Sequence, residues 1–322
     1  MSDYGWRRGP NTGILRAPPG GFSMSDPSPI PARGRIASGG LVFLTVTTVA
    51  WGLSWPVTKY LIAQWPPLPL RGLTGIAGSL ALFGYAALRG DSLSVPRDQR
   101  LRLVVSAFFN VTLWMAVMGL ALLWLPAGET AVIAYTMPVW TALLAWPLLG
   151  ERLTLRRVAA LALAFGGIAA LMGAAGFAAS MTKLPGILLA LTGALGFALG
   201  TIFLKRFPIA LPGATSAAWQ IGLGCIPVAV IGLAFEIPHP SVLTPLGWAG
   251  LVYLVVIQFC VAYVCWFAAL QRLPASVAAI GTMATPVIGV IASAVALHEP
   301  LGVGQIAALV MTLTGVALAT RS

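Results

Sequence analysis

The chain has 322 residues, of which 58% are apolar and only 8% are charged, and its formal net charge is +11. Soluble domains carry about 25% charged residues and disordered chains are poor in apolar residues, so the composition excludes both classes. It is typical of a polytopic membrane protein, and its scattered basic residues fit an anionic membrane surface rather than nucleic acid.

The N-terminal segment, residues 1–40, differs from the rest of the chain. It contains five arginines and is rich in proline and glycine, so we expect a disordered basic tail. It lacks the apolar core and the cleavage site of a signal peptide. The sequence leaves open whether translation starts at Met1 or at Met24.

From residue 41 onward, the chain is a series of apolar blocks long enough to cross a bilayer, which takes about 20 residues. The predicted fold class is therefore an all-α polytopic membrane protein with ten transmembrane helices. The predicted spans are 41–62, 68–88, 103–124, 129–149, 157–175, 186–204, 214–235, 247–270, 276–297 and 302–319.

The basic residues between these spans predict the orientation. Ten spans place sixteen of the nineteen Lys and Arg residues on the side of the N-terminal tail, and only Lys183 in a loop on the opposite side. Because cytoplasmic loops are enriched in basic residues, we expect both termini to be cytoplasmic and the protein to reside in the cell (inner) membrane.

An internal repeat is visible at an offset of 148 residues. Pairs of identical residues at this offset are Pro126 and Pro274, Ala127 and Ala275, Pro138 and Pro286, Glu151 and Glu299, Leu153 and Leu301, and Gly167 and Gly315. The offset spans five helices, an odd number, so the second copy enters the membrane from the opposite side. Residues 41–175 and 184–319 are therefore predicted to be two inverted five-helix repeats, an arrangement typical of secondary transporters.

These motifs resemble the drug/metabolite transporter superfamily, specifically its EamA-type ten-helix exporters. The first span has the family's opening run from Trp51 and Gly52 to Lys59, and Arg71 stands where an arginine is usual early in helix two. The fourth and ninth spans end in similar Pro and Glu motifs, although His298 replaces the usual Gly before Glu299. The resemblance covers about residues 41–319.

The resemblance implies a secondary transporter that exports small metabolites, such as amino acids or their derivatives, by alternating access. The expected partners are a small-molecule substrate and the lipid bilayer, with a homodimer left open, and no cofactor, metal or nucleic acid is expected. A channel or scaffold is the alternative function. A membrane enzyme is less favoured, because the two histidines are far apart and no deep carboxylate pair exists in the sequence.

The first span offers one polar and aromatic face. Trp51, Trp55 and Lys59 are spaced by four residues and share a side of the helix. They are candidates for a cavity wall with a cation, although Lys59 could instead extend to the membrane interface and the tryptophans could serve packing. Arg71 could bind an anionic group of the substrate or hydrogen-bond loop carbonyls.

Later spans add amide and aromatic candidates for the same cavity. These are Asn110 and Trp114 in the third span, Trp219 and Gln220 in the seventh, and Gln258 and Trp266 in the eighth. The repeat places Asn110 and Gln258 at equivalent positions, so they could face a common axis; alternatively, such amides join neighbouring helices. Gly196 and Gly200 are expected to serve close helix packing.

Two prolines are candidate hinges. Pro138 lies between Tyr135 and Trp140 in the fourth span, and Pro286 follows Thr282 in the ninth. Proline removes a helical hydrogen bond, so both helices are expected to kink, either as moving hinges or as static bends. Tyr135 and Thr282 are further cavity candidates.

The acidic residues are expected outside the middle of the spans. Glu129, Glu151 and Glu299 fall at helix ends, where Glu151 beside Arg152 is expected to form a cap or surface ion pair, and Glu299 with His298 is a candidate proton-responsive pair. Small multidrug resistance exporters, which the family resembles in its repeat unit, use a deep Glu in helix one. That acid is absent here, so a neutral, zwitterionic or anionic substrate is favoured over a cationic drug.

Overall fold

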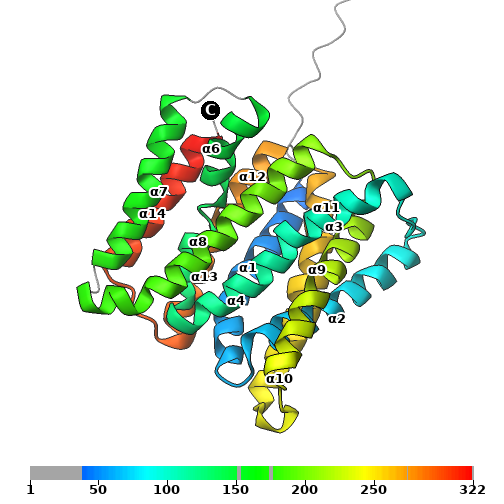
Figure 1. Ribbon diagram of the computed structural model, residues 1–322, viewed down its shortest axis with the longest axis horizontal. Coiled ribbons are helices and arrows are strands. Elements are labelled where there is room, and N and C mark those ends of the chain that lie inside the picture. The colour runs from blue at the N-terminus through cyan, green and yellow to red at the C-terminus, as the bar shows by residue number, and fades with distance from the viewer. Residues whose placement is uncertain (1–37, 151–153, 174–176, 274, 321–322) are drawn as a thin grey trace, which may run out of the picture. The chain divides into compact units, whose positions relative to one another are not determined.

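Helices account for all regular structure in the part of the chain that the computed structural model describes, residues 38–150, 154–173, 177–273 and 275–320, and no strand occurs there (Figure 1). Six of the helical segments, each 23 to 28 residues long, are apolar enough to cross a membrane. The chain is therefore an all-helical, multi-pass membrane protein. Most of the predicted disordered tail and the predicted role of Glu151 lie outside the described residues.

The first half of the chain begins within the predicted tail, at Ser38. Its elements are α1 (Ser38–Ile62), α2 (Pro67–Leu88), η1 (Arg97–Gln99), α3 (Arg100–Ala107), η2 (Phe108–Leu113), α4 (Trp114–Trp124), α5 (Ala127–Ala134), α6 (Met137–Leu149) and α7 (Leu155–Gly173). The segment from η1 to α4 is continuous, and η2 within it is π-helical.

The second half continues with a longer first helix than the predicted span 186–204. Its elements are α8 (Phe177–Arg206), α9 (Gly213–Phe235), η3 (Pro240–Val242), α10 (Pro245–Val252), η4 (Tyr253–Val261), α11 (Ala262–Leu270), α12 (Ala275–Thr282), α13 (Ala284–Leu297) and α14 (Val303–Thr320). The η4 segment is also π-helical.

A shift of 148 residues carries the elements of the first half onto those of the second. It moves α5 onto α12 residue for residue, and it places η2 inside η4. The helix ends also correspond, because α6 is followed by Gly150 (φ 71°) and α13 by His298 (φ 55°). Glycine adopts this left-handed conformation without strain, whereas other residues rarely do.

The fourth and ninth predicted spans are each divided into two helices. α5 ends at Ala134, four residues before Pro138, and α12 ends at Thr282, four residues before Pro286. Because proline has no N–H, the carbonyl four residues earlier lacks its helical partner. The kinks predicted at the prolines are thus found as short interruptions of the regular helix just before them, at Tyr135 and Thr136 and at Met283.

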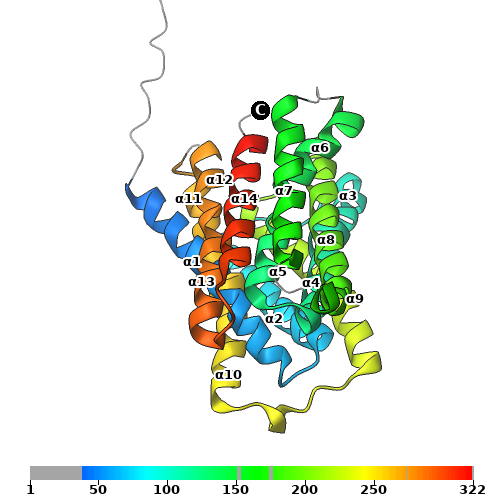
Figure 2. The same ribbon diagram turned by 90° about the vertical axis from the view of Figure 1, so that its left-hand side faces the viewer.

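The two halves interlock rather than forming separate bundles. α1 packs mainly against α13 and α11 of the second half, while α8 packs against α4 and α6 of the first. The equivalent helices α7 and α14 lie side by side, and so do α2 and α9 (Figures 1 and 2). The α2–α9 approach is close enough that a Cβ atom at Gly72 would collide with the backbone of Ala229.

The helices run between two ends that are named here for use below. The tail end is the end where α1 begins and α14 finishes. The Lys59 end, at the bottom of Figure 1, is where α1 finishes, α2 and α10 begin, and α4 is followed by α5.

Candidate functional site

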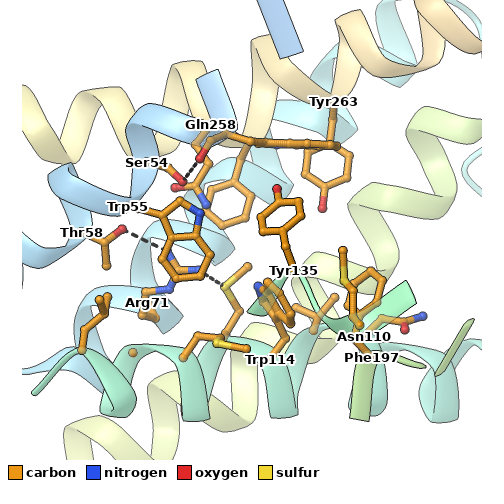
Figure 3. A pocket seen from close by; sticks show the side chains of 18 residues that line it. Ser54, Trp55, Thr58, Arg71, Asn110, Trp114, Tyr135, Phe197, Gln258 and Tyr263 are labelled. Atoms are coloured by element: carbon orange, nitrogen blue, oxygen red, sulfur yellow. Dashed lines mark hydrogen bonds between the residues drawn. The ribbon is translucent and has the colours of Figure 1, made fainter. Parts of the chain in front are cut away.

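A central cavity of about 150 Å³ lies between the two halves of the chain (Figure 3). α1, α2, η2, α4, the turn between α5 and α6, and α6 contribute lining residues from the first half, and α8, η4 and α11 from the second. Its polar and aromatic lining residues are Trp51, Ser54, Trp55, Thr58, Arg71, Asn110, Trp114, Tyr135, Phe197, Gln258, Phe259 and Tyr263. This set contains seven of the residues that the sequence nominated for a cavity.

Arg71 is the only charged side chain among the described residues that line this cavity. It projects from the second turn of α2 and is only 6% exposed, and the absence of a side chain at Gly119 leaves room for its stem. Nη1 donates to Thr58 Oγ1 at 3.4 Å and Nη2 to Met115 Sδ at 2.7 Å, while Nε has no partner. A guanidinium has five N–H donors, so Arg71 retains capacity to bind an anion.

Two amide side chains reach the cavity from the two π-helical segments. Asn110 lies on η2 and Gln258 on η4, and π-helical turns are frequent at functional sites. Gln258 is 7% exposed, and neither its Oε1 nor the Oδ1 of Asn110 has a hydrogen-bond partner. Two buried acceptors without a partner therefore lie on residues that line the cavity, in addition to the donors of Arg71.

Aromatic rings form much of the remaining wall. Trp51 contacts the ring of Tyr263 edge-on, with centroids 5.5 Å apart, and Trp114 lies 5.2 Å from Phe197. Figure 3 shows Trp55, Trp114 and Tyr135 surrounding the space beside Arg71. Such a wall suits the apolar part of a small amphiphilic ligand.

A second cavity of about 300 Å³ adjoins the first toward the tail end. The two share Asn110, Val111, Phe197 and Tyr263 among their lining residues. The second also includes the predicted residues Gln220 and Trp266, and it extends to Leu211 and Gly213, where the chain enters α9. The central cavity thus continues toward the tail end.

Three predicted cavity residues line neither cavity. Lys59 donates to the backbone carbonyls of Leu122 and Leu125, the latter at 3.0 Å. Trp219 donates to the carbonyl of Leu93 at 2.9 Å, and its ring contacts that of Phe83. Thr282 is the last residue of α12, at the break before Pro286.

Several lining residues were not nominated from the sequence, notably Met115, Phe197 and Tyr263. Phe197 follows Gly196 in the predicted packing motif, and a Cβ atom at Gly200 would meet the Asn110 side chain 2.7 Å from Cγ. Close contact between α8 and η2 therefore brings Phe197 to the cavity. The glycine pair was the available sequence signal, because a helix face without side chains must approach its neighbour closely.

Comparison with known proteins identifies relatives of the whole helical part. The model of the EamA-like transporter family matches residues 38–173 and again residues 184–321. The Bacillus subtilis (strain 168) proteins "Uncharacterized transporter YvbV" and "Uncharacterized transporter YoaV" are 30% and 23% identical to the chain. The first match covers 86% of this chain and 90% of the relative, the second 85% and 94%.

A solved structure titled "Crystal structure of protein" has the same fold. It superposes with a TM-score of 0.63 at 24% identity, covering 89% of this chain and 97% of that one. The two matches to one family model span most of the chain. The chain therefore belongs to the EamA-like transporter family, in which its two halves are two copies of one domain.

Proposed function

We propose that the chain is a secondary transporter that exports small carboxylate-bearing metabolites, such as amino acids or their derivatives, by alternating access to the central cavity. The observation that carries this proposal is the buried Arg71, with free hydrogen-bonding capacity, in a cavity lined by both halves. A buried charge without an ionic partner is expensive in a membrane protein, and such residues usually serve function.

The proposed architecture is ten transmembrane helices in two inverted five-helix repeats. The helix breaks, the π-helical segments and the helix ends all recur at the 148-residue offset. Five spans separate equivalent elements when α5–α6 and α12–α13 are each counted as one broken span. A broken helix in each half and a cavity at the interface of the repeats are features of alternating-access carriers.

The substrate class follows from the chemistry of the lining. A carboxylate would accept from Arg71, and an ammonium or amide group would donate to Gln258 or Asn110. The aromatic wall would hold the apolar part. A cation has no carboxylate to meet among the described lining residues, so cationic drugs fit poorly.

The proposed location is the cell membrane, with both termini in the cytoplasm. The tail end carries most of the basic residues that the structure describes, including Arg97, Arg100 and Arg272, and cytoplasmic loops are enriched in such residues. In this orientation the two cavities extend toward the cytoplasm, which suits loading of an exported substrate.

The experiment is counterflow in sealed vesicles containing the purified protein. A panel of carboxylate metabolites is screened by thermal shift, and stabilising ligands are tested as radiolabelled substrates. We expect saturable uptake that is stimulated by unlabelled substrate inside, which a channel would not give. Arg71→Ala should reduce it at least about thirtyfold, because losing one partner of a buried charged contact costs that much.

The matched control is Arg97→Ala, which removes an exposed arginine. It should leave counterflow unchanged. Arg71→Lys should retain only part of the activity, because an ammonium cannot reproduce the planar guanidinium fork. Equal counterflow in Arg71→Ala and the control would contradict the proposed anion site, and flux without counterflow would favour a channel. Replacing both histidines by alanine tests the enzyme alternative. Loss of a measured chemical turnover in this variant would support an enzyme.

A further inference from the structure

The turn between α4 and α5 is held by a carboxylate from the other half of the chain. Glu299, in the loop between α13 and α14, accepts from the backbone N–H of Ala127 at 2.6 Å and of Gly128 at 3.0 Å. These are the first N–H groups of α5, which have no helical acceptor. The helix dipole also favours an anion at this position. Glu299 thus caps α5 across the interface of the halves.

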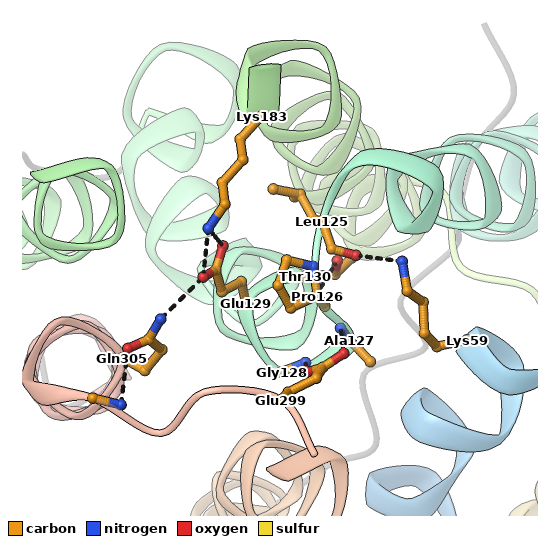
Figure 4. Close-up of polar contacts among 11 residues, drawn as sticks. Lys59, Leu125, Pro126, Ala127, Gly128, Glu129, Thr130, Lys183, Glu299 and Gln305 are labelled. Carbon is orange, nitrogen blue, oxygen red and sulfur yellow. Dashed lines mark hydrogen bonds and ion pairs between the residues drawn. The ribbon is translucent and has the colours of Figure 1, made fainter. Parts of the chain in front are cut away.

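A cation holds the other side of the same turn. Lys59, near the end of α1, donates to the carbonyls of Leu122 and Leu125, at the C-terminal end of α4. Free carbonyls and the negative end of the helix dipole favour a cation there. Figure 4 shows Lys59 reaching the turn from a helix and Glu299 reaching it from a loop. We call residues Leu122–Gly128 the α4–α5 corner.

A buried ion pair strengthens the link between α5 and the second half. Lys183, on α8, donates to both carboxylate oxygens of Glu129 at 2.8 and 2.9 Å. Gln305, on α14, donates to Oε1 of the same carboxylate at 3.1 Å (Figure 4). The first turn of α5 therefore contacts three segments of the second half, which are α8, α14 and the loop between α13 and α14. Of these three contacts, that of Glu299 is made by the loop.

The α4–α5 corner borders the central cavity at the Lys59 end. Leu122, whose carbonyl binds Lys59, itself lines the cavity. α5 has only eight residues and leads from the Glu299 contact directly to Tyr135, which also lines the cavity. The helix is separated from α6 by the interruption before Pro138, where proline already removes one helical hydrogen bond.

We propose that the contact between Glu299 and the N-terminus of α5 is the gate at the Lys59 end, and that it breaks when the cavity opens to that side. This proposal rests on the proposed alternating-access function. Glu299 acts as a positioning residue, because it holds α5 and does not touch the cavity. His298 begins the loop in the left-handed conformation, and this turn directs the chain at Glu299 toward α5.

The test is thiol labelling from the Lys59 side, which needs no known substrate. The reporter is Ser54→Cys, because Ser54 lines the cavity and its hydroxyl binds only its own helix, at the carbonyl of Trp51. The background replaces Cys225, Cys260 and Cys265 by Ala. A membrane-impermeant maleimide is applied to sealed vesicles of known orientation, and the labelling rate is measured from each side.

We expect Glu299→Ala to raise the rate from the Lys59 side at least about tenfold, because hydrogen bonds to a charged acceptor are worth that much or more. Glu299→Gln should have a smaller effect, since its amide oxygen can still accept one N–H. The matched control is Glu236→Gln, an exposed carboxylate where α9 finishes at the same end, and it should change nothing. A purely structural cap would lower thermal stability without a side-specific change in labelling, and that result would overturn the proposal.

A second variant keeps the proposal testable if Glu299→Ala does not fold. The Gly128→Cys and Glu299→Cys pair tests a disulfide in place of the hydrogen bond between the Gly128 N–H and the Glu299 carboxylate. Oxidation should abolish labelling of the reporter from the Lys59 side and preserve it from the tail side, with reversal by reductant. Unchanged labelling from the Lys59 side in the cross-linked protein would overturn the gate. Because the labelling rates require no substrate, they can refute the gate independently of the Arg71 counterflow experiment, which tests the proposed transport function.

Discussion

The α4–α5 corner and its equivalent, the α11–α12 corner (residues 270–276), have the same place in the two repeats but different chemistry. Leu125 and Leu273 are equivalent, and both are buried. Around the α11–α12 corner, Leu44 and Phe43 of α1 pack against Leu273, and the exposed Arg272 donates to the carbonyl of Ala268 at 2.8 Å.

Two charged groups of the α4–α5 corner have apolar counterparts, whereas Glu299 corresponds to Glu151, which lies outside the described residues. The 148-residue offset carries Lys59 onto Phe207 and Glu129 onto Val277. The cavities approach the end that lacks these groups, through Leu211 and Gly213. The comparison teaches that equivalent corners of a duplicated fold can differ in their charged residues: the α4–α5 corner has Lys59 and Glu129 at positions where the second copy has Phe207 and Val277.

The largest effect should come from the buried ion pair at the Lys59 end. Glu129 is 3% exposed and Lys183 is 20% exposed, so Lys183→Met leaves a buried carboxylate with only Gln305 as a donor. We expect a loss of about 4 kcal/mol of unfolding free energy, measured by denaturation in detergent. The charge-swapped double variant, Glu129→Lys with Lys183→Glu, should recover part of it.

The control for this prediction is Arg97→Met, which removes one positive charge at an exposed position near the tail end. It should alter the unfolding free energy by less than about 0.5 kcal/mol. Equal stability of Lys183→Met and the control would show that the ion pair does not hold the Lys59 end.

The next largest difference in unfolding free energy between the two corners should appear at the two equivalent leucines. Leu125 belongs to the largest buried cluster and Leu273 to a small one. Removing a buried leucine side chain leaves a cavity, and its cost depends on how well the surroundings can collapse. We expect Leu125→Ala to lose about 3 kcal/mol and Leu273→Ala about 2 kcal/mol in the same assay. The reverse order would contradict the tighter packing of the α4–α5 corner.

A smaller difference in unfolding free energy is expected at the two residues with positive φ that follow α6 and α13. Gly150 and His298 are equivalent, and only His298 has a side chain that is strained by its positive φ. His298→Gly should therefore raise the unfolding free energy by about 1 kcal/mol, while Gly150→Ala should lower it by a similar amount. A loss of stability in His298→Gly would mean that the imidazole makes a contact that outweighs the strain.

The smallest effect should come from the two equivalent amides. Asn110→Ala and Gln258→Ala each remove one unpartnered acceptor from the cavity. We expect each to weaken substrate binding about threefold, because a hydrogen bond between groups in a membrane protein averages about 0.6 kcal/mol. Equilibrium binding of the substrate found by counterflow measures this. Unaltered affinity in both variants would remove the amides from the proposed site.

Much of this fold was predictable because hydropathy and proline act locally. Apolar blocks identify the membrane helices, and the offset of Pro138 and Pro286 reveals the duplication. The cavity was partly predictable for a related reason. A charged or amide residue inside an apolar helix, such as Arg71 or Gln258, must meet water, a partner or a ligand.

The contacts of the α4–α5 corner were not predictable from the same signals. Periodicity indicates which face of a helix is polar, but it does not identify the segment that the face meets. The spacing of Lys59 with Trp51 and Trp55 predicts that it lines the cavity, yet Lys59 binds the carbonyls at the end of α4. Glu299 was paired with His298 in the sequence, whereas its acceptor atoms bind residues more than 170 positions away.

The most direct test of the account is the labelling of Asn110→Cys, which lies where the two cavities meet. In the cysteine-free background, with the gate residues intact, a membrane-impermeant maleimide is applied to each side of sealed vesicles. We predict fast labelling from the tail side and slow labelling from the Lys59 side. Glu299→Ala should raise the labelling rate from the Lys59 side relative to the rate from the tail side. Equal rates from both sides, unaffected by Glu299→Ala, would contradict a carrier that is closed at the α4–α5 corner.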